Sequence, residues 1–270
     1  MLPSRLTKEC SLETKEDSAV RVSYSLKAPA TTETPVDPFH GLRVAITGGT
    51  SGLGLALVRE LTQRGARVAF VARTAERVDR VRQQYPGTHG IVADVSNKND
   101  IYRIAMQVTG ELGGLDVLIN NASTLGPIPL TMLSDTECED LEQTFATNVF
   151  GPFRLTKALM GALAASAREG SGAVVLNVIS DAAINPYPTW GAYGASKAAL
   201  HHLSRIWNEE HSSEGIQFLS LDPGDMDTPM HAAALPDADR STLKQPEQSA
   251  HEFAEAIAAV LPQQIATVTY

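Results

Sequence analysis

Six short apolar runs, separated by longer stretches of helical character, constrain the fold of this chain more than any other feature. Each run is rich in β-branched residues and lacks polar alternation, which is typical of strands buried on both faces of a parallel sheet. The segments between them are long enough for crossover helices, so we expect an α/β fold with one doubly wound parallel sheet and helices on both faces. The runs are Leu42–Ile46, Val68–Val71, Gly90–Ala93, Val117–Ile119, Ala173–Ile179 and Phe218–Leu221.

The first forty residues differ from the rest of the chain. Residues 1–40 mix charges of both signs with four prolines, and Thr31–Pro38 is typical of a linker. We expect an N-terminal arm over residues 1–40 that is extended or disordered, with a strand over Val20–Leu26 as the alternative. Residues 41–270 are expected to form a single domain, because this length leaves little room for a second. Its last expected elements are a helix over Glu252–Val260 and a strand over Ile265–Thr269.

Composition argues against several classes of protein. The formal net charge of −9 disfavours nucleic acid and anionic membranes as partners, while leaving room for a local basic pocket. Only two cysteines occur, Cys10 and Cys138, so we expect no disulfide framework and a cytoplasmic location. No apolar run is long enough to span a membrane, and the N-terminus lacks the apolar segment of a secretory signal. The seven histidines show no metal-ligand spacing, so no metal site is expected.

A glycine-rich turn follows the first apolar run directly and precedes a helical pattern. Its sequence is Thr47-Gly48-Gly49-Thr50-Ser51-Gly52-Leu53-Gly54. Glycines permit a tight turn and a close approach of the backbone to a pyrophosphate, and the helix N-terminus adds free N–H groups and the positive end of its dipole. No Lys-Ser or Lys-Thr pair closes the turn, which excludes a P-loop. The position of the turn between strand and helix therefore indicates a dinucleotide site.

The spacing Thr47-Gly48-x-x-x-Gly52-x-Gly54 resembles the glycine motif of the short-chain dehydrogenases/reductases, and it differs from the G-x-G-x-x-G of other Rossmann enzymes. The resemblance extends over about residues 41–265, because three more motifs follow in the family's order: Asp94-Val95, Asn120-Asn121-Ala122, and Asp222-Pro223-Gly224 with Thr228. It implies a Rossmann-type domain. In that family, the motif matched by Asp94-Val95 reads the adenine, the Asn-Asn-Ala motif lines the cofactor cleft, and the Pro-Gly loop holds the nicotinamide carboxamide. One departure is Ser123, where the family usually has glycine.

Four further residues match the catalytic residues of that family. Asn148 lies in a long helix predicted around Glu142–Arg168, and Ser180 ends the fifth apolar run. Tyr193 follows Ser180 by thirteen residues, and Lys197 follows Tyr193 by four, which places both on one helix face. The resemblance implies that the backbone carbonyl of Asn148 holds a water that links the lysine to solvent.

These side chains suit proton transfer to a carbonyl oxygen. A tyrosine with a pKa of about 10 is a poor base by itself, and we expect the charge of Lys197, together with an oxidised nicotinamide, to lower the pKa of Tyr193. Ser180 can hydrogen-bond the same substrate oxygen and stabilise charge in the transition state. Tyr187, Pro188 and Trp190 are expected to form one wall of a substrate pocket that is partly apolar and aromatic. The family resemblance implies that a lid over residues 229–245 forms the other wall.

The residue after the second apolar run indicates the choice of cofactor. NAD enzymes carry an acidic residue there for the ribose diol, and this chain has Ala72. The guanidinium of Arg73 suits a 2′-phosphate, so we expect NADP(H) to be preferred, with NAD(H) possible; the alternative is that Arg73 is simply a solvated residue. The expected cofactor-binding residues are Thr47, Gly48, Thr50, Ser51, Gly52, Leu53, Gly54, Arg73, Thr74, Asp94, Val95, Asn121, Ala122, Tyr193, Lys197, Pro223, Gly224, Met226 and Thr228.

Together these features predict an NADP(H)-dependent oxidoreductase that transfers hydride between the nicotinamide and a ketone, aldehyde or secondary alcohol. The alternative is a non-catalytic dinucleotide-binding protein with a regulatory or scaffold role, which would not need Tyr193 and Lys197. A sugar-nucleotide epimerase or dehydratase would need a further substrate domain. The family resemblance also implies a homodimer or homotetramer, formed through the long helices around Glu142–Arg168 and Ala192–Glu210.

Overall fold

The computed structural model of the chain describes residues 37–262. The arm up to residue 36, the strand considered over Val20–Leu26 and the strand predicted over Ile265–Thr269 lie outside these residues. The last residues of the predicted arm pack onto the domain: Phe39 is fully buried, and the Arg64 guanidinium lies 4.7 Å from the centre of its ring. The folded part of the chain therefore includes Asp37, whose carboxylate binds Arg64 at 2.9 Å.

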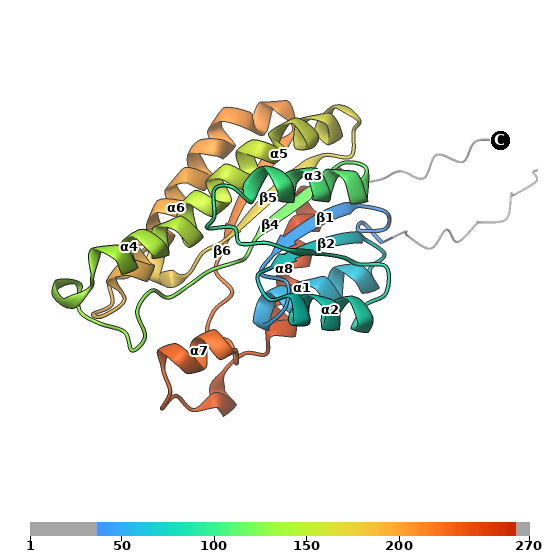
Figure 1. Cartoon of the computed structure of the whole chain (residues 1–270). Helices are drawn as coiled ribbons and strands as arrows, with labels where there is room; N and C mark the ends of the chain where they lie inside the picture. Colours follow the sequence, from blue (N-terminus) through green and yellow to red (C-terminus); the bar gives the residue numbers. More distant parts are fainter. Residues whose placement is uncertain (1–36, 263–270) are drawn as a thin grey trace, which may run out of the picture. The chain divides into compact units, whose positions relative to one another are not determined.

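Six parallel strands form one sheet in the order β3-β2-β1-β4-β5-β6 (Figure 1). They coincide with the apolar runs of the sequence to within two residues, which confirms the expected fold. The strand order reverses between β1 and β4, where Val44 lies opposite Val117. In open α/β sheets, ligands bind at the carboxyl ends of the strands beside such a reversal. The bounds are β1 Arg43–Thr47, β2 Arg67–Ala72, β3 His89–Val92, β4 Val117–Asn120, β5 Ala173–Val178 and β6 Ile216–Leu221.

Helices cover both faces of the sheet (Figure 1). One face packs against α1 (Gly52–Gln63), α2 (Ala75–Gln84) and α8 (Pro246–Val260), and the other against α3 (Ile101–Leu112), α5 (Gly151–Arg168) and α6 (Gly191–His211). Strand β1 supplies both cores, because Val44 and Ile46 belong to the first and Ala45 to the second. Burial on both faces explains why the middle of each strand is apolar and the polar residues lie at or next to the strand ends.

The long helix expected before the fifth strand is continuous but not uniform. Helix α4 (Cys138–Phe145) runs through a π-helical turn, Ala146–Phe150, into α5. At the start of α5, a Cβ on Gly151 would lie 2.9 Å from the Val95 carbonyl oxygen, so glycine permits this close approach. The π-helical turn carries Asn148 and faces the carboxyl ends of the strands.

A small lid follows β6 and lies below the sheet in Figure 1. It consists of α7 (Pro229–Ala234) and the 3₁₀ turn Arg240–Thr242. Its two ends are joined by a bridge between Met226 and Lys244, and Asp227 binds Arg240 at 2.7 Å. The other 3₁₀ turns are Leu133–Asp135, Asp181–Ala183 and Ser212–Glu214. Within residues 37–262, no helix has the length and apolar character required to cross a membrane.

Candidate active site

A cleft of about 650 Å³ opens at the carboxyl ends of the strands. All but one of the nineteen residues predicted to bind cofactor line it, and so do Ser180, Tyr193 and Lys197. The two predicted residues that do not line the cleft are Thr47 and Asn148, and both are buried behind its wall. The structure thus gathers the motifs of all six strand ends around one cavity of the size that small molecules and cofactors occupy.

The glycine turn is closed so tightly that side chains are excluded from it. A Cβ on Gly54 would lie 2.1 Å from the Gly48 carbonyl oxygen, and Gly48 itself has a φ of +73°. The Asn121 amide donates to the carbonyls of Thr47 at 2.9 Å and Gly48 at 3.3 Å, which ties the turn to the end of β4. The turn therefore leaves no room for side chains at these glycines, and its backbone borders the cleft at the start of α1, where the helix N-terminus suits a pyrophosphate.

Thr47 supports the same wall from behind. Its hydroxyl oxygen accepts hydrogen bonds from the backbone N–H groups of Asn121 and Ala122, each at 3.0 Å. This fixes the loop after β4 relative to the loop after β1. Thr47 therefore holds the loop that forms the wall of the cleft in place, and its own side chain does not line the cleft.

The end of the cleft beside β2 is basic. Arg73 and Thr74 follow β2, as the sequence predicts, and Arg77 joins them from the first turn of α2. Both arginines are exposed, and neither forms an ion pair with a carboxylate in residues 37–262. Sequence reasoning missed Arg77, although its spacing of four from Arg73 was the available signal. Across the cleft, the Asp94 carboxylate accepts from the backbone and hydroxyl of Ser96 at 2.9 and 2.8 Å.

The side chain of Asn148, in the π-helical turn between α4 and α5, forms four hydrogen bonds. Its Oδ1 accepts from the Thr124 backbone N–H at 2.9 Å and from the Ser123 hydroxyl at 3.1 Å. Its Nδ2 donates to the Thr124 carbonyl at 2.8 Å and to Ser196 Oγ at 2.9 Å. Ser123, the departure from the family pattern, thus adds a hydroxyl to this network, and Ser196 links it to the helix that carries Tyr193.

Tyr193 and Lys197 lie one turn apart on α6 and are both buried, with 8% and 2% of their surfaces exposed. The Lys197 ammonium donates to the Val178 carbonyl at 2.7 Å and lies 5.5 Å from the centre of the Tyr193 ring. Ser180 follows β5 and faces the same cavity. The Trp190 ring packs edge-on against Tyr193 at 5.7 Å between centres. The structure therefore brings together the three side chains for which the sequence predicts proton transfer.

The ionisation of this pair differs from the sequence-based expectation. Burial raises the pKa of Tyr193 to about 12; a hydrogen bond with the Ser180 hydroxyl opposes the rise, and the charges of Asp222 and Asp181 add to it. Burial also lowers the pKa of Lys197 to about 7, against the attraction of Asp222. Without nucleotide, the cost of burying Tyr193 outweighs the lowering of its pKa expected from Lys197, and the part of the expectation that involves the oxidised nicotinamide stays a prediction.

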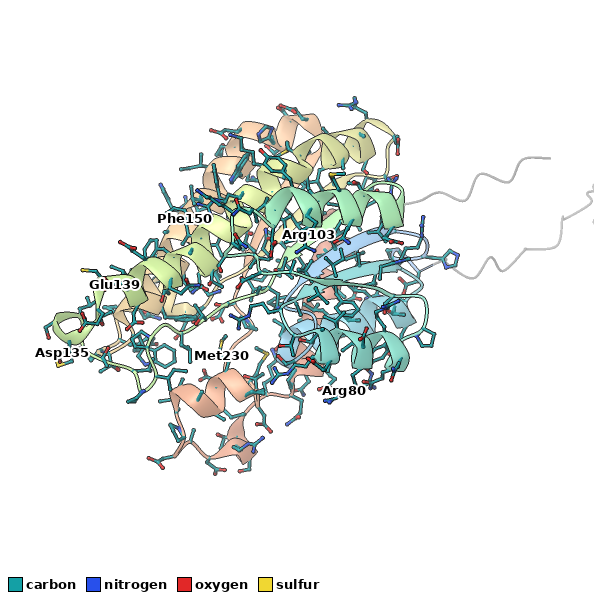
Figure 2. The ribbon with its side chains drawn as sticks, viewed as in Figure 1. Arg80, Arg103, Asp135, Glu139, Phe150 and Met230 are labelled. Atoms are coloured by element: carbon teal, nitrogen blue, oxygen red, sulfur yellow. The ribbon has the colours of Figure 1, made fainter. Side chains whose placement is uncertain are left out.

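The far end of the cavity is bordered by the loop after β5 and by the lid. Tyr187 and Trp190 line it from the loop, and Met230 and Leu235 line it from the lid. Figure 2 shows Met230 on α7. His231 also lines this end, with its Nε2 at 3.9 Å from Asp225. The pocket is mixed, with apolar walls and several carboxylates.

The family model of short chain dehydrogenases matches residues 43–239 of the chain. The chain belongs to the short-chain dehydrogenase family. It is 30% identical over 233 residues to glucose 1-dehydrogenase of Gluconobacter oxydans, covering 82% of this chain and 85% of that protein. It is also 30% identical to an uncharacterized oxidoreductase of Staphylococcus epidermidis, over 68% of this chain and 78% of the relative.

Solved structures of family members agree with the fold. A putative short chain dehydrogenase from Pseudomonas syringae superimposes with a TM-score of 0.74 at 28% identity, covering 87% of this chain and 95% of that one. A short chain dehydrogenase from Burkholderia cenocepacia, solved in complex with NADP, gives a TM-score of 0.72 at 25% identity over 84% and 93% of the two chains. The chain is therefore an oxidoreductase-family member with a Rossmann-type sheet.

Proposed function

We propose that this protein is an NADP(H)-dependent oxidoreductase that reduces ketones or aldehydes, or oxidises the corresponding secondary alcohols. The observation that carries the proposal is the convergence of Ser180, Tyr193 and Lys197 on the same cavity as the glycine turn. A bound nicotinamide supplies or accepts the hydride, and the residues of the chain handle the proton and the substrate oxygen.

Tyr193 is the proton donor in the direction of reduction. Its raised pKa keeps the phenol protonated at neutral pH, which is the form required to protonate an alkoxide as it develops. Ser180 stabilises charge on the same oxygen, since its hydroxyl shares the cavity with the phenol. Lys197 lies behind Tyr193 with a pKa of about 7, so it can take up and release a proton near neutral pH.

The preference for NADP(H) is supported by the charges at the β2 end of the cleft. Ala72 offers no carboxylate to a ribose diol, while Arg73 and Arg77 offer two guanidinium groups to a 2′-phosphate. Two exposed arginines without carboxylate partners can turn toward an incoming phosphate without breaking an existing pair in the described chain. NAD(H) remains the second cofactor, since the glycine turn serves both.

Assembly through α5 and α6 is part of the proposal, as the family resemblance implies. Phe150 and Ile206 lie on this side of the molecule and are 46% and 42% exposed. Light scattering after size-exclusion chromatography tests it: we expect the mass of a homodimer or homotetramer of the 28.9 kDa chain, and a monomer at micromolar concentration would contradict it.

A carbonyl panel tests the proposed function. Purified protein with NADPH is mixed with small aliphatic and aromatic ketones and aldehydes, and the loss of NADPH absorbance is followed. Oxidation of NADPH with formation of the matching alcohol is expected for at least one class. Tight NADPH binding without turnover of any member would favour the non-catalytic reading, a dinucleotide-binding module, instead.

A further inference from the structure

The Asp181 carboxylate joins two other residues on the wall of the cleft. Its Oδ1 accepts a hydrogen bond from Ser180 Oγ at 3.1 Å, and its Oδ2 accepts one from the Tyr187 hydroxyl at 2.6 Å. All three residues line the cavity. Ser180 Oγ also accepts from the Ala182 backbone N–H at 3.2 Å. The hydroxyl of Ser180 is thus held between one donor and one acceptor.

We propose that Asp181, anchored by Tyr187, is a positioning residue that fixes the Ser180 hydroxyl for the reaction. The inference rests on the proposed function, in which Ser180 binds the substrate oxygen. A serine side chain has three staggered rotamers, and each places the hydroxyl oxygen at a different point in the cavity. The contacts with Asp181 and with the Ala182 N–H select one rotamer of the side chain in advance, which lowers the entropy lost when substrate binds. When substrate binds, the hydroxyl proton turns about the Cβ–Oγ bond from Asp181 Oδ1 to the substrate oxygen, so Asp181 fixes the position of Oγ and gives up the proton.

The geometry distinguishes this role from a structural one. The Asp181 side chain is exposed and forms no ion pair in the described part of the chain, so it adds little to the stability of the fold. The partners of Asp181 are Ser180, which takes part in the proposed reaction, and Tyr187, an aromatic residue in the wall of the substrate pocket. Hydrogen bonds to an ionised carboxylate are short and strong, and the bond from Tyr187 has such a length. It restricts the carboxylate, which then restricts Ser180.

Other charged groups face the same region and must be separated from this effect. Asp222, after β6, acts on Tyr193 through its charge alone, and Lys197 lies behind the phenol on α6. Asp225 and His231 line the cavity from the loop after β6 and from the lid. Among the described residues, Asp222 forms no hydrogen bond with Ser180, so Asp222→Asn serves as a control for the loss of a nearby charge.

A double-mutant cycle between positions 180 and 181 tests the proposal in the whole, NADPH-loaded protein. Asp181→Ala should lower kcat about tenfold, and Tyr187→Phe should lower it by a few-fold with a KM within about twofold of wild type. In a Ser180→Ala background, Asp181→Ala should change kcat by less than about twofold, because there is no hydroxyl left to position. Asp222→Asn should change kcat by the same factor in the wild-type protein and in the Ser180→Ala variant. An Asp181→Ala effect that persists in full without the Ser180 hydroxyl would overturn the proposal.

Crystal structures provide a readout that does not depend on turnover. Wild type should show Ser180 in one rotamer with its Oγ on Asp181, whereas Asp181→Ala should show the side chain in a second rotamer or in several. An unchanged single rotamer in Asp181→Ala overturns the positioning role. Failure of the wild-type protein to reduce any carbonyl would overturn the proposed function instead, and the rotamers would still decide the positioning of Ser180.

Discussion

The two ends of the cleft present their titratable side chains in opposite ways. At the β2 end, Arg73 and Arg77 are exposed and have no carboxylate partner among residues 37–262. At the β5 end, Tyr193 and Lys197 are buried, and Lys197 is fixed on a backbone carbonyl. Water and salt screen the first pair, whereas burial desolvates the second pair, which shifts the pKa values of Tyr193 and Lys197 toward their neutral forms. We therefore expect small, salt-dependent effects from changes at the β2 end and large effects from changes at the β5 end.

The largest effect is expected from Tyr193→Phe. The change removes one oxygen from a buried ring and leaves the cleft intact, so kcat should fall by at least about 10²-fold while NADPH binding persists. Steady-state kinetics and a fluorescence titration with NADPH measure the two quantities. Tyr102→Phe is the matched control, because Tyr102 is 75% exposed on α3 and should behave as wild type. Turnover by Tyr193→Phe near the wild-type rate would refute the assigned role.

The next effect concerns the dependence of stability on pH. Lys197 has a pKa of about 7 in the folded protein and its ordinary value of 10.5 in the unfolded chain. Between these values the unfolded chain binds more protons, so this group makes the free energy of unfolding rise with pH, and its contribution is most unfavourable below pH 7. Lys197→Met removes the group while keeping a chain of similar length.

Urea unfolding of both proteins without nucleotide, at several values between pH 7 and 9, measures this difference. The stability of wild type relative to Lys197→Met should increase with pH by about 2 kcal/mol over this range, since one pKa unit corresponds to about 1.4 kcal/mol. Lys197→Met also loses the hydrogen bond to the Val178 carbonyl. That loss would lower the free energy of unfolding of the variant by the same amount at every pH, so it would not change the slope of its pH dependence. Parallel curves would show that Lys197 keeps an ordinary pKa in the fold.

The sequence predicts the fold and the residues around the cleft better than it predicts the state of those residues. Strands buried on both faces leave a continuous apolar signal, and glycines such as Gly54 mark a turn that tolerates no Cβ. Burial of Lys197 and Tyr193 depends on which elements pack over α6, and the spacing of four does not contain that information. The bonds from Ser123 to Asn148 and from Tyr187 to Asp181 likewise depend on tertiary packing. Phe39 falls within the predicted arm, whose mixed charges and prolines are typical of a linker, although its side chain belongs to the core.

At the β2 end, the expected effects are smaller. We expect wild type to prefer NADPH over NADH by at least about tenfold in kcat/KM, which corresponds to about 1.4 kcal/mol. Arg73→Ala should remove most of this preference by raising the KM for NADPH, and Arg77→Ala should remove a part of it. Arg80→Ala is the control, since Arg80 lies on the same helix but does not line the cleft (Figure 2). Equal or better use of NADH by the wild type would refute the assignment of Arg73.

The smallest effect is expected from salt, and it compares both ends in one protein. Exposed charges are screened within about 10 Å at 0.1 M salt, whereas buried groups are not. Raising NaCl from about 20 mM to 0.5 M should therefore weaken NADPH binding several-fold more than NADH binding, because only NADPH carries the 2′-phosphate that the arginines face. The kcat at saturating cofactor and substrate should change by less than about twofold, since Tyr193 and Lys197 are shielded from the ions.

In the double variant Arg73→Ala with Arg77→Ala, salt should weaken the binding of NADPH and of NADH by the same factor. An equal response of both cofactors in wild type would mean that the arginines do not contact the phosphate, and a kcat that falls with salt would mean that the buried end of the cleft is less shielded than its exposure indicates.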